Sequence, residues 1–291
     1  MNKNNVVVLG KFDGVHIAHM CLVEKAVEIA AKFNKKTLVY SMQKTGTVNL
    51  TDQKQKEEIL KKQGIDLVVF RTLDREFMDM SAKDFAEKIL FRELDAAYVV
   101  VGENFRFGKN RMADCYDLKH LLADFGIDVI VIDTVKIGGC DVSSTKIRSL
   151  VSNGEMQEAK AYLGRAYSVN GIVSEGKHLG TKLGFPTVNL YPDIDTHLPK
   201  RGVYATVTHH SGKSYFSVTN VGINPTVEDT RSIKLETHIL EDVGNLYGEE
   251  ITVEFVDFIR EERVFDSIWD LKIQIEKDKQ RAIEINKSFA D

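Results

Sequence analysis

Short runs of apolar, β-branched residues recur through the first half of the chain, and a segment with helical spacing follows most of them. The expected strands are Val6–Leu9, Thr37–Met42, Leu67–Phe70, Tyr98–Val101 and Asp128–Ile132. The expected helices between them are Ala18–Phe33, Asp52–Gln63, Ala82–Glu93 and Tyr116–Phe125. Because strands that are apolar throughout are buried on both faces, this order predicts a doubly wound parallel sheet covered by helices. Ligands of such sheets bind at the carboxyl ends of the strands.

The pattern changes near residue 165. Two short helices, expected at Ser144–Val151 and Glu155–Leu163, end at Gly164, a common helix stop. Strands then dominate, at Tyr167–Ser174, Val203–His209, Tyr215–Val221, Lys234–Leu240 and Glu250–Phe258. The turn-rich segments between them predict a small antiparallel barrel or sandwich. We place the domain boundary between Arg165 and Ala166, which gives domains 1–165 and 166–291.

A long helix is expected to end the chain, over Phe265–Asn286. Its apolar stripe contains Ile268, Leu271, Ile275, Ala282 and Ile285. The charge balance excludes some classes of partner: a formal net charge of −4 argues against broad binding to nucleic acids or membrane surfaces. Cys21, Cys115 and Cys140 form no CxxC pair and predict buried thiols in a reducing compartment. With no signal peptide and no membrane-spanning run, we expect a cytoplasmic protein.

The stretch GKFDGVHIAH, residues 10–19, lies where the first strand meets the first helix. Gly10 and Gly14 would let the backbone approach a ligand closely. If a helix starts near Val15, His16 and His19 project from one face of its first turn, beside backbone N–H groups that suit an anion. Two imidazoles there could hold the phosphates of a nucleotide. On spacing alone, an ordinary turn with surface histidines explains the stretch about as well.

Several segments resemble those of one enzyme family, in its order and at its spacing. In the first half these segments are GKFDGVHIAH, GENFRFG at 102–108 and SSTKIR at 143–148. In the second half they are GKHLGTKLGFPTVNL at 176–190, GVY at 202–204, NVGINPT at 220–226, LETHIL at 235–240 and IREERVF at 259–265. Over nearly its whole length the chain resembles the prokaryotic bifunctional riboflavin kinase/FAD synthetase family.

The resemblance implies two reactions that both consume ATP. An N-terminal nucleotidylyltransferase domain of Rossmann type would transfer AMP to FMN, giving FAD and pyrophosphate. A C-terminal six-stranded antiparallel riboflavin kinase barrel with a long C-terminal helix would phosphorylate riboflavin to FMN. Mg²⁺ would assist, and the partners would be small molecules, with the protein a monomer or a weak homo-oligomer.

The resemblance also implies roles for individual residues. His16 and His19 match phosphate-stabilising histidines, and Glu236 matches the general base of the kinase. The implied nucleotide contacts are Gly10, Phe12, Asp13, Gly14, Ser144, Thr145, Arg148, Gly176, Gly180, Lys182, Thr187 and Asn189. The implied flavin contacts are Asn104, Arg106 and Arg260. Thr187 and Asn189 are two apart, so in an extended segment both face one way and could bind Mg²⁺ together with ATP phosphates.

Other interpretations of these residues stay open. LETHIL also fits a solvent-facing strand. Arg106 could be a solvated surface charge, and Arg260 could form a salt bridge to a nearby Glu. Ala18 stands where the family has Gly, and the segment SMQKTGTVNLTDQ lacks the family's Pro-His-Pro element. An alternative function is therefore that of a riboflavin kinase with a weakened or inactive adenylyltransferase domain. A third is a flavin carrier without catalysis.

Overall fold

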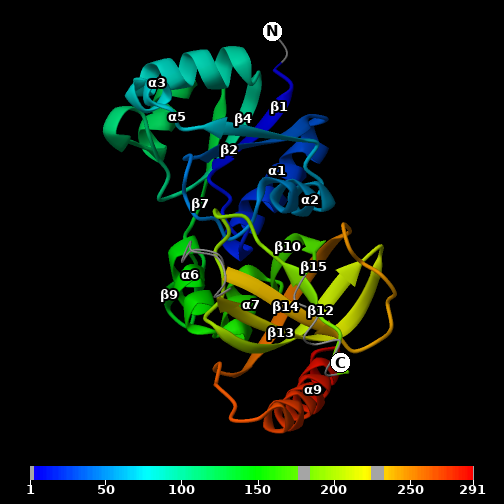
Figure 1. Cartoon of the computed structure of the whole chain (residues 1–291). Coiled ribbons are helices and arrows are strands. Elements are labelled where there is room, and N and C mark those ends of the chain that lie inside the picture. The colour runs from blue at the N-terminus through cyan, green and yellow to red at the C-terminus, as the bar shows by residue number, and fades with distance from the viewer. Residues whose placement is uncertain (1–2, 176–183, 224–232, 291) are drawn as a thin grey trace. The chain divides into compact units, whose positions relative to one another are not determined.

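The computed structural model describes residues 3–175, 184–223 and 233–290, which form two compact units, Met1–Ser144 and Thr145–Asp291 (Figure 1). The strands of the first unit are β1 (Asn5–Gly10), β2 (Lys36–Gln43), β3 (Leu67–Thr72), β4 (Ala96–Gly102), β5 (Arg106–Phe107), β6 (Ala113–Asp114), β7 (Asp128–Ile132), β8 (Lys136–Ile137) and β9 (Cys140–Asp141). Its helices are α1 (Ile17–Phe33), α2 (Gln53–Lys62), α3 (Arg75–Asp79), α4 (Ala82–Asp84), η1 (Phe85–Glu93), η2 (Lys109–Arg111) and α5 (Cys115–Ala123).

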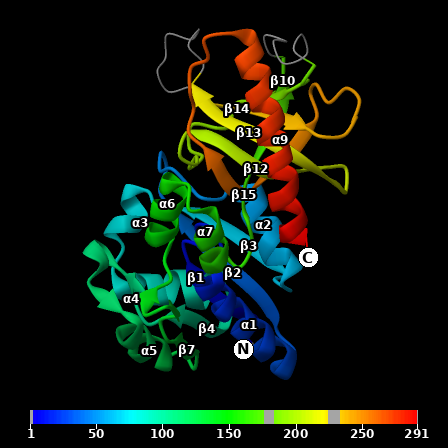
Figure 2. The same cartoon turned by 90° about the horizontal axis from the view of Figure 1, so that it is seen from below.

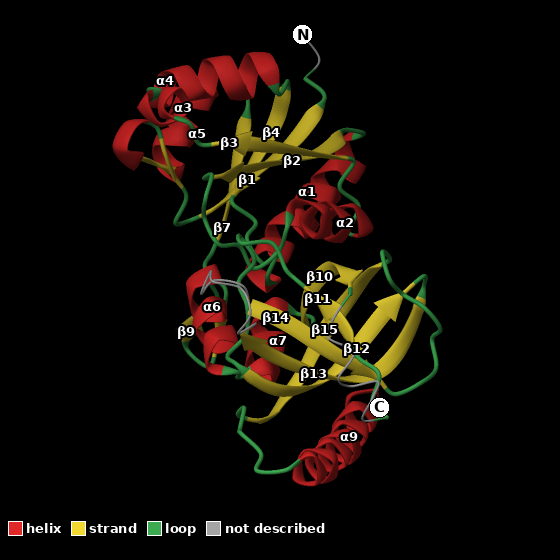
Figure 3. Ribbon diagram, in the orientation of Figure 1, coloured by secondary structure: helices red, strands yellow, loops and turns green. Residues whose placement is uncertain are grey.

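The first unit contains a parallel sheet whose described strands run in the order β3-β2-β1-β4-β7. Helices flank both faces of this sheet (Figure 3). Alternate residues of β1 enter different cores: Val7 and Leu9 pack with η1 and α5, while Val6 and Val8 pack with α1. The predicted doubly wound sheet is confirmed, because β1 is apolar on both faces and each face is covered.

One predicted helix, Ala82–Glu93, has a different form. Only Ala82–Asp84 is α-helical, and Phe85–Glu93 is a π-helix, which ends where the N–H of Leu94 bonds to the carbonyl of Ile89. Sequence periodicity also missed α3 and the two-residue hairpin strands. Each of these elements is too short to show a repeat.

The second unit starts with α6 (Ser144–Asn153, which spans the division) and α7 (Met156–Leu163). Its described strands are β10 (Tyr167–Ser174), β11 (Val188–Leu190), β12 (Gly202–His210), β13 (Lys213–Ile223), β14 (Ile233–Ile239) and β15 (Glu250–Arg260). These strands close a barrel in the order β10-β11-β14-β13-β12-β15, which confirms the predicted barrel. Its interior holds hydroxyl groups: Thr206, Ser217 and Thr219 are fully buried, and Thr206 Oγ1 is hydrogen-bonded to the hydroxyl groups of the other two.

Helix α9 (Ile268–Ala290) lies along the outer face of the barrel, against β12, β13 and β15 (Figure 2). It begins later than predicted because Ser267 caps it, accepting from the N–H of Asp270 at 3.1 Å. Ile268 is 65% exposed and does not join the buried stripe. Ala282 and Ile285 do pack on the barrel, against Ala205 and Val207. No helix among the described residues is both long and apolar enough to cross a membrane.

The prediction of buried thiols is confirmed for Cys115 alone of the three cysteines. Cys21 is partly exposed and Cys140 is exposed, because Cys140 lies in the short hairpin strand β9 and not in a core element.

Candidate active sites

The turn between β1 and α1 builds the first candidate site. His16 is the N-cap of α1, and its Nδ1 accepts from the N–H of His19 at 3.4 Å, while the Nδ1 of His19 accepts from the N–H of His16 at 3.3 Å. The two rings stack with centroids 3.6 Å apart. Because each Nδ1 accepts, a neutral ring carries its hydrogen on Nε2. Both histidines thus form one donor pair at the positive end of a helix.

The backbone of this turn is held in an unusual conformation. Phe12 and Val15 have φ angles of 51° and 40°, and both side chains are fully buried. A positive φ at a β-branched valine is a genuine outlier and is typical of functional turns. Gly10 is needed for close packing, since a Cβ there would lie 3.0 Å from the Phe12 ring.

Three hydrogen bonds to Leu50, Thr51 and Ser144 stabilise the conformation of this turn. Asp13 Oδ1 accepts from the N–H of Leu50 at 2.8 Å, and the N–H of Gly14 donates to Thr51 Oγ1 at 3.2 Å. The carbonyl of Asp13 accepts from Ser144 Oγ at 2.8 Å. Leu50 and Thr51 belong to the segment that lacks the Pro-His-Pro element, so this segment still supports the turn. Thr145 and Arg148 lie in the second unit, and their contact with a nucleotide stays a prediction.

A cavity of about 750 Å³ opens at the carboxyl ends of β1 to β4. It is lined by Gly10, Lys11, Met42, Leu73, Arg75, Phe77, Met78, Asp79, Met80, Phe85, Asn104, Phe105, Arg106, Phe107, Gly108, Asn110 and Arg111. Its volume and mixed apolar and polar lining suit a cofactor-sized ligand. Asn104 and Arg106 line this cavity, and their contact with flavin stays a prediction. Sequence reasoning missed the methionines and α3, because their neighbours in the cavity come from distant parts of the chain.

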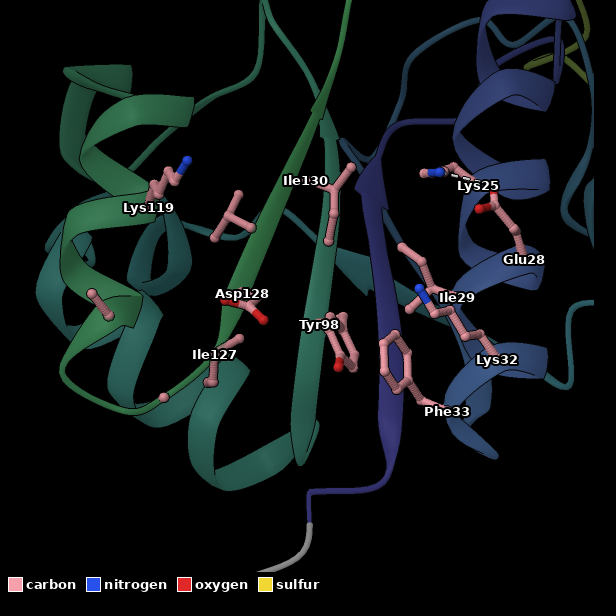
Figure 4. A pocket seen from close by; sticks show the side chains of 13 residues that line it. Lys25, Glu28, Ile29, Lys32, Phe33, Tyr98, Lys119, Ile127, Asp128 and Ile130 are labelled. Atoms are coloured by element: carbon pink, nitrogen blue, oxygen red, sulfur yellow. Dashed lines mark hydrogen bonds and ion pairs between the residues drawn. The ribbon is translucent and has the colours of Figure 1, made fainter.

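A second cavity, of about 610 Å³, lies at the opposite ends of the strands, near the start of β4 and β7 (Figure 4). The rings of Phe33 and Tyr98 stack there, with centroids 5.1 Å apart. Lys25 is paired with Glu28 at 2.8 Å. Because this cavity is at the amino ends of the strands, it is separate from the turn between β1 and α1 that carries His16 and His19.

The second candidate site lies on the outer face of the barrel. Asn189 on β11, Glu236 on β14 and Asn220 on β13 are register partners in one row across three strands. Side chains directly opposite one another share a face with Cβ atoms about 5 Å apart. Glu236 is therefore next to Asn189, as the predicted metal and base site requires. The two are not on opposite walls of the barrel.

The surroundings of Glu236 are polar. Lys234, two residues earlier and 11% exposed, forms an ion pair with its carboxylate. His238 Nδ1 donates to the carbonyl of Pro186 at 2.8 Å and so anchors the segment that leads into Thr187 and Asn189. Burial lowers the pKa of His238. Among the described residues, no group of three or more His, Cys, Asp and Glu is placed to bind a metal ion.

The sequence reasoning gave no individual role to Asn220 of this row or to Glu262, which lies beside it. Asn220 Nδ2 donates to Glu262 Oε1 at 3.2 Å. A Cβ at Gly222 would lie 2.5 Å from the same Glu262 oxygen, so the glycine makes room for this carboxylate. Asn220 and Gly222, from the start of the motif NVGINPT, thus lie beside Glu262 of the motif IREERVF. The occurrence of both motifs in one chain is the sequence signal that could have indicated this contact.

Arg260 is engaged by the C-terminal helix. Its Nε and Nη2 donate to the carboxylate of Asp278 at 2.7 to 3.0 Å, and Asp278 is 4% exposed. Its Nη1 donates to the carbonyl of Glu261. Arg260 thus forms a salt bridge, but its partner is Asp278 of α9 and not the nearby Glu that the alternative interpretation expected. Contact of Arg260 with flavin stays a prediction. Gly176, Gly180 and Lys182 lie outside the described residues.

The strained turn with His16 and His19, called the histidine turn below, lies on a doubly wound sheet, and the Asn189–Glu236–Asn220 row lies on a closed barrel. This architecture defines a protein with two separate candidate enzyme sites. Two family models match the chain: FAD synthetase over residues 1–146 and riboflavin kinase over residues 163–286. The chain belongs to the bifunctional riboflavin kinase/FMN adenylyltransferase family.

Curated relatives agree with this assignment. The bifunctional riboflavin kinase/FMN adenylyltransferase of Listeria monocytogenes is 31% identical over 287 residues, which cover 95% of this chain and 91% of the relative. The protein of the same description from Haemophilus influenzae is 33% identical over 286 residues, covering 95% and 92%. A crystal structure described as a macrolide-efflux protein from Streptococcus pneumoniae shares the fold, with a TM-score of 0.86, 26% identity and coverage of 96% and 94%. We take only the fold from that structure.

Proposed function

We propose that the first unit transfers AMP from ATP to FMN at the histidine turn. The phosphate oxygen of FMN attacks the α-phosphorus of ATP, the bond to the bridging oxygen breaks, and pyrophosphate leaves. The Nε2–H groups of His16 and His19 donate to phosphate oxygens as negative charge grows on the leaving group. The flavin ring occupies the 750 Å³ cavity, with Asn104 and Arg106 at its polar edge.

The second unit phosphorylates riboflavin in the same proposal. Glu236 takes the proton of the ribityl 5′-hydroxyl as that oxygen attacks the γ-phosphorus, and ADP leaves. The hydroxyl of Thr187, the amide oxygen of Asn189 and the neighbouring carboxylate are hard oxygen donors, which fit Mg²⁺. Thr187 and Asn189 would hold this ion, which when bound neutralises phosphate charge. The register pair Asn189–Glu236 is the observation that carries the proposal.

We retain 1–165 and 166–291 as the functional domains. The two family matches support a division in this region, since they leave residues 147–162 between them. The cytoplasmic location and the monomeric or weakly oligomeric state remain proposals of the same kind.

A product analysis tests the function. Purified protein is incubated with riboflavin, ATP and Mg²⁺, and separately with FMN, ATP and Mg²⁺, and the flavins are separated by chromatography. We expect FMN and FAD in the first mixture and FAD in the second. FMN alone would indicate a kinase without adenylyltransferase activity, and neither product would refute both assignments.

A further inference from the structure

A lysine is fully buried beneath the histidine turn. Lys56 on α2 is 1% exposed and is among the largest completely buried side chains of the described residues. Removing an ammonium group from water is costly unless polar groups and charges compensate it. Nothing in the proposed reaction so far uses this cation.

The contacts of Lys56 converge on the first residue of the turn. Its Nζ donates to the carbonyl of Lys11 at 3.2 Å and lies 3.5 Å from Ser41 Oγ. Ser41 Oγ donates to the same Lys11 carbonyl at 3.0 Å. The ring of Phe70 lies 5.7 Å from the ammonium, a cation–π distance. Two donors from different elements thus hold one carbonyl oxygen.

Charge also couples Lys56 to the turn. Burial lowers the pKa of Lys56, and the carboxylates of Asp13 and Asp52 oppose this shift. Asp13 is itself a turn residue and is 5% exposed. The cation and the turn therefore stabilise each other in a region of low dielectric constant.

The turn needs such support because its backbone is sterically unfavourable. Phe12, directly after Lys11, has a φ of 51°, and Val15, directly before the N-cap histidine, has a φ of 40°. Backbone conformations of this kind persist only where many contacts with the surrounding residues hold them in place. A released Lys11 carbonyl would let the turn relax, and the histidines that follow would move with it.

We propose that Lys56 is a positioning residue for adenylyl transfer, which holds the Lys11 carbonyl so that the strained turn presents His16 and His19 to the nucleotide phosphates. This inference rests on the proposed adenylyltransferase function. Lys56 does not touch the substrate, and its effect passes through the turn. A displacement of about 1 Å at a reacting group can cost about 100-fold in rate.

The test compares Lys56→Met with the wild-type enzyme. Methionine fills similar space without the ammonium group, so we expect a folded protein. In FAD synthesis from FMN and ATP, kcat should fall about 10- to 100-fold. KM for FMN should change less than about threefold, because Lys56 does not line the flavin cavity. Lys61→Met, on the exposed side of α2, is the matched control and should leave both parameters unchanged.

Two further measurements separate positioning from mere stability. Riboflavin phosphorylation in the same Lys56→Met sample should stay within about twofold of wild type. Ser41→Ala removes the other donor to the same carbonyl and should lower kcat of FAD synthesis in the same direction. The double variant should lose less than the product of the two single losses, because both act on one oxygen.

The outcomes are distinct. If wild-type protein makes no FAD, the proposed function fails before Lys56 is tested. If wild type makes FAD and folded Lys56→Met does so with unchanged kcat, the positioning role is overturned. If Lys56→Met does not fold, Ser41→Ala decides: an unchanged kcat overturns the proposal, and a lowered kcat with unchanged KM for FMN supports it.

Discussion

Replacing Glu236 by Gln isolates the proton-transfer step of the riboflavin kinase. Glutamine keeps the shape of the side chain and can still accept from Lys234, but it cannot take a proton from the ribityl hydroxyl. General-base catalysis contributes about 10²- to 10⁴-fold, which corresponds to about 3–5 kcal/mol on the barrier. We therefore expect kcat for FMN formation to fall by at least 100-fold, with little change in KM for riboflavin.

The same substitution should hardly change stability. The Glu236 side chain is 43% exposed, and ion pairs at that exposure contribute at most about 1 kcal/mol. A large loss of activity with an unchanged unfolding curve would thus show that the substitution affects the catalytic step and not the stability of the fold.

The assay follows FMN formation from riboflavin and MgATP by chromatography and FAD formation from added FMN in the same sample. Glu254→Gln is the matched control, because Glu254 is a partly buried strand glutamate paired with His209 at 3.0 Å, outside the Asn189–Glu236 row. The control should keep wild-type kinase rates. If Glu236→Gln keeps kcat within about threefold of wild type, the general-base assignment is refuted.

Three other predictions concern separate parts of the chain. His19→Ala should lower FAD formation about 100-fold and leave riboflavin phosphorylation intact; equal losses in both assays would contradict a local role. Asp278→Ala leaves the Arg260 guanidinium without its carboxylate, so urea unfolding of the barrel should show about 3 kcal/mol less stability, and an unshifted midpoint would argue against a stabilising pair. Burial lowers the pKa of His238, so below pH 6.5 the unfolded chain binds a proton more readily than the folded one. Stability should therefore fall as the pH decreases through 6.5, and His238→Gln should flatten this dependence; an identical profile in the variant would exclude His238 as its source.

The strands of both units could be predicted closely from their residues. β10 has the predicted bounds, Tyr167–Ser174, and β7 has the predicted bounds, Asp128–Ile132. Both follow from local patterns of β-branched and alternating residues, which tertiary packing did not override. β11, by contrast, has three residues, Val188–Leu190, and exists because β10 and β14 pair with it. A strand of three residues is too short to show the alternation of apolar and polar residues from which strands are predicted.

The histidine turn was found from GKFDGVHIAH because its glycines, histidines and helix start are contiguous. The 750 Å³ cavity at the carboxyl ends of the strands could not be found in this way. Met42 is the second-last residue of β2, Leu73 follows β3 and Asn104 lies shortly after β4, so only the parallel order of the strands brings them to one edge.

Sequence alone determined the alternation of strands and helices, the histidine turn and the spacing of Thr187 and Asn189, because each depends on neighbours within a few residues. Only the tertiary structure decided that Glu236 stands opposite Asn189, since that pairing joins residues 47 positions apart through a strand register. It also decided that Lys56, and not Lys54 or Lys61 of the same helix, is buried under the turn. Nothing in QKQKEEILKK distinguishes these lysines except that Lys56 is one turn before the buried Leu60, and burial depends on what the rest of the chain places over that face.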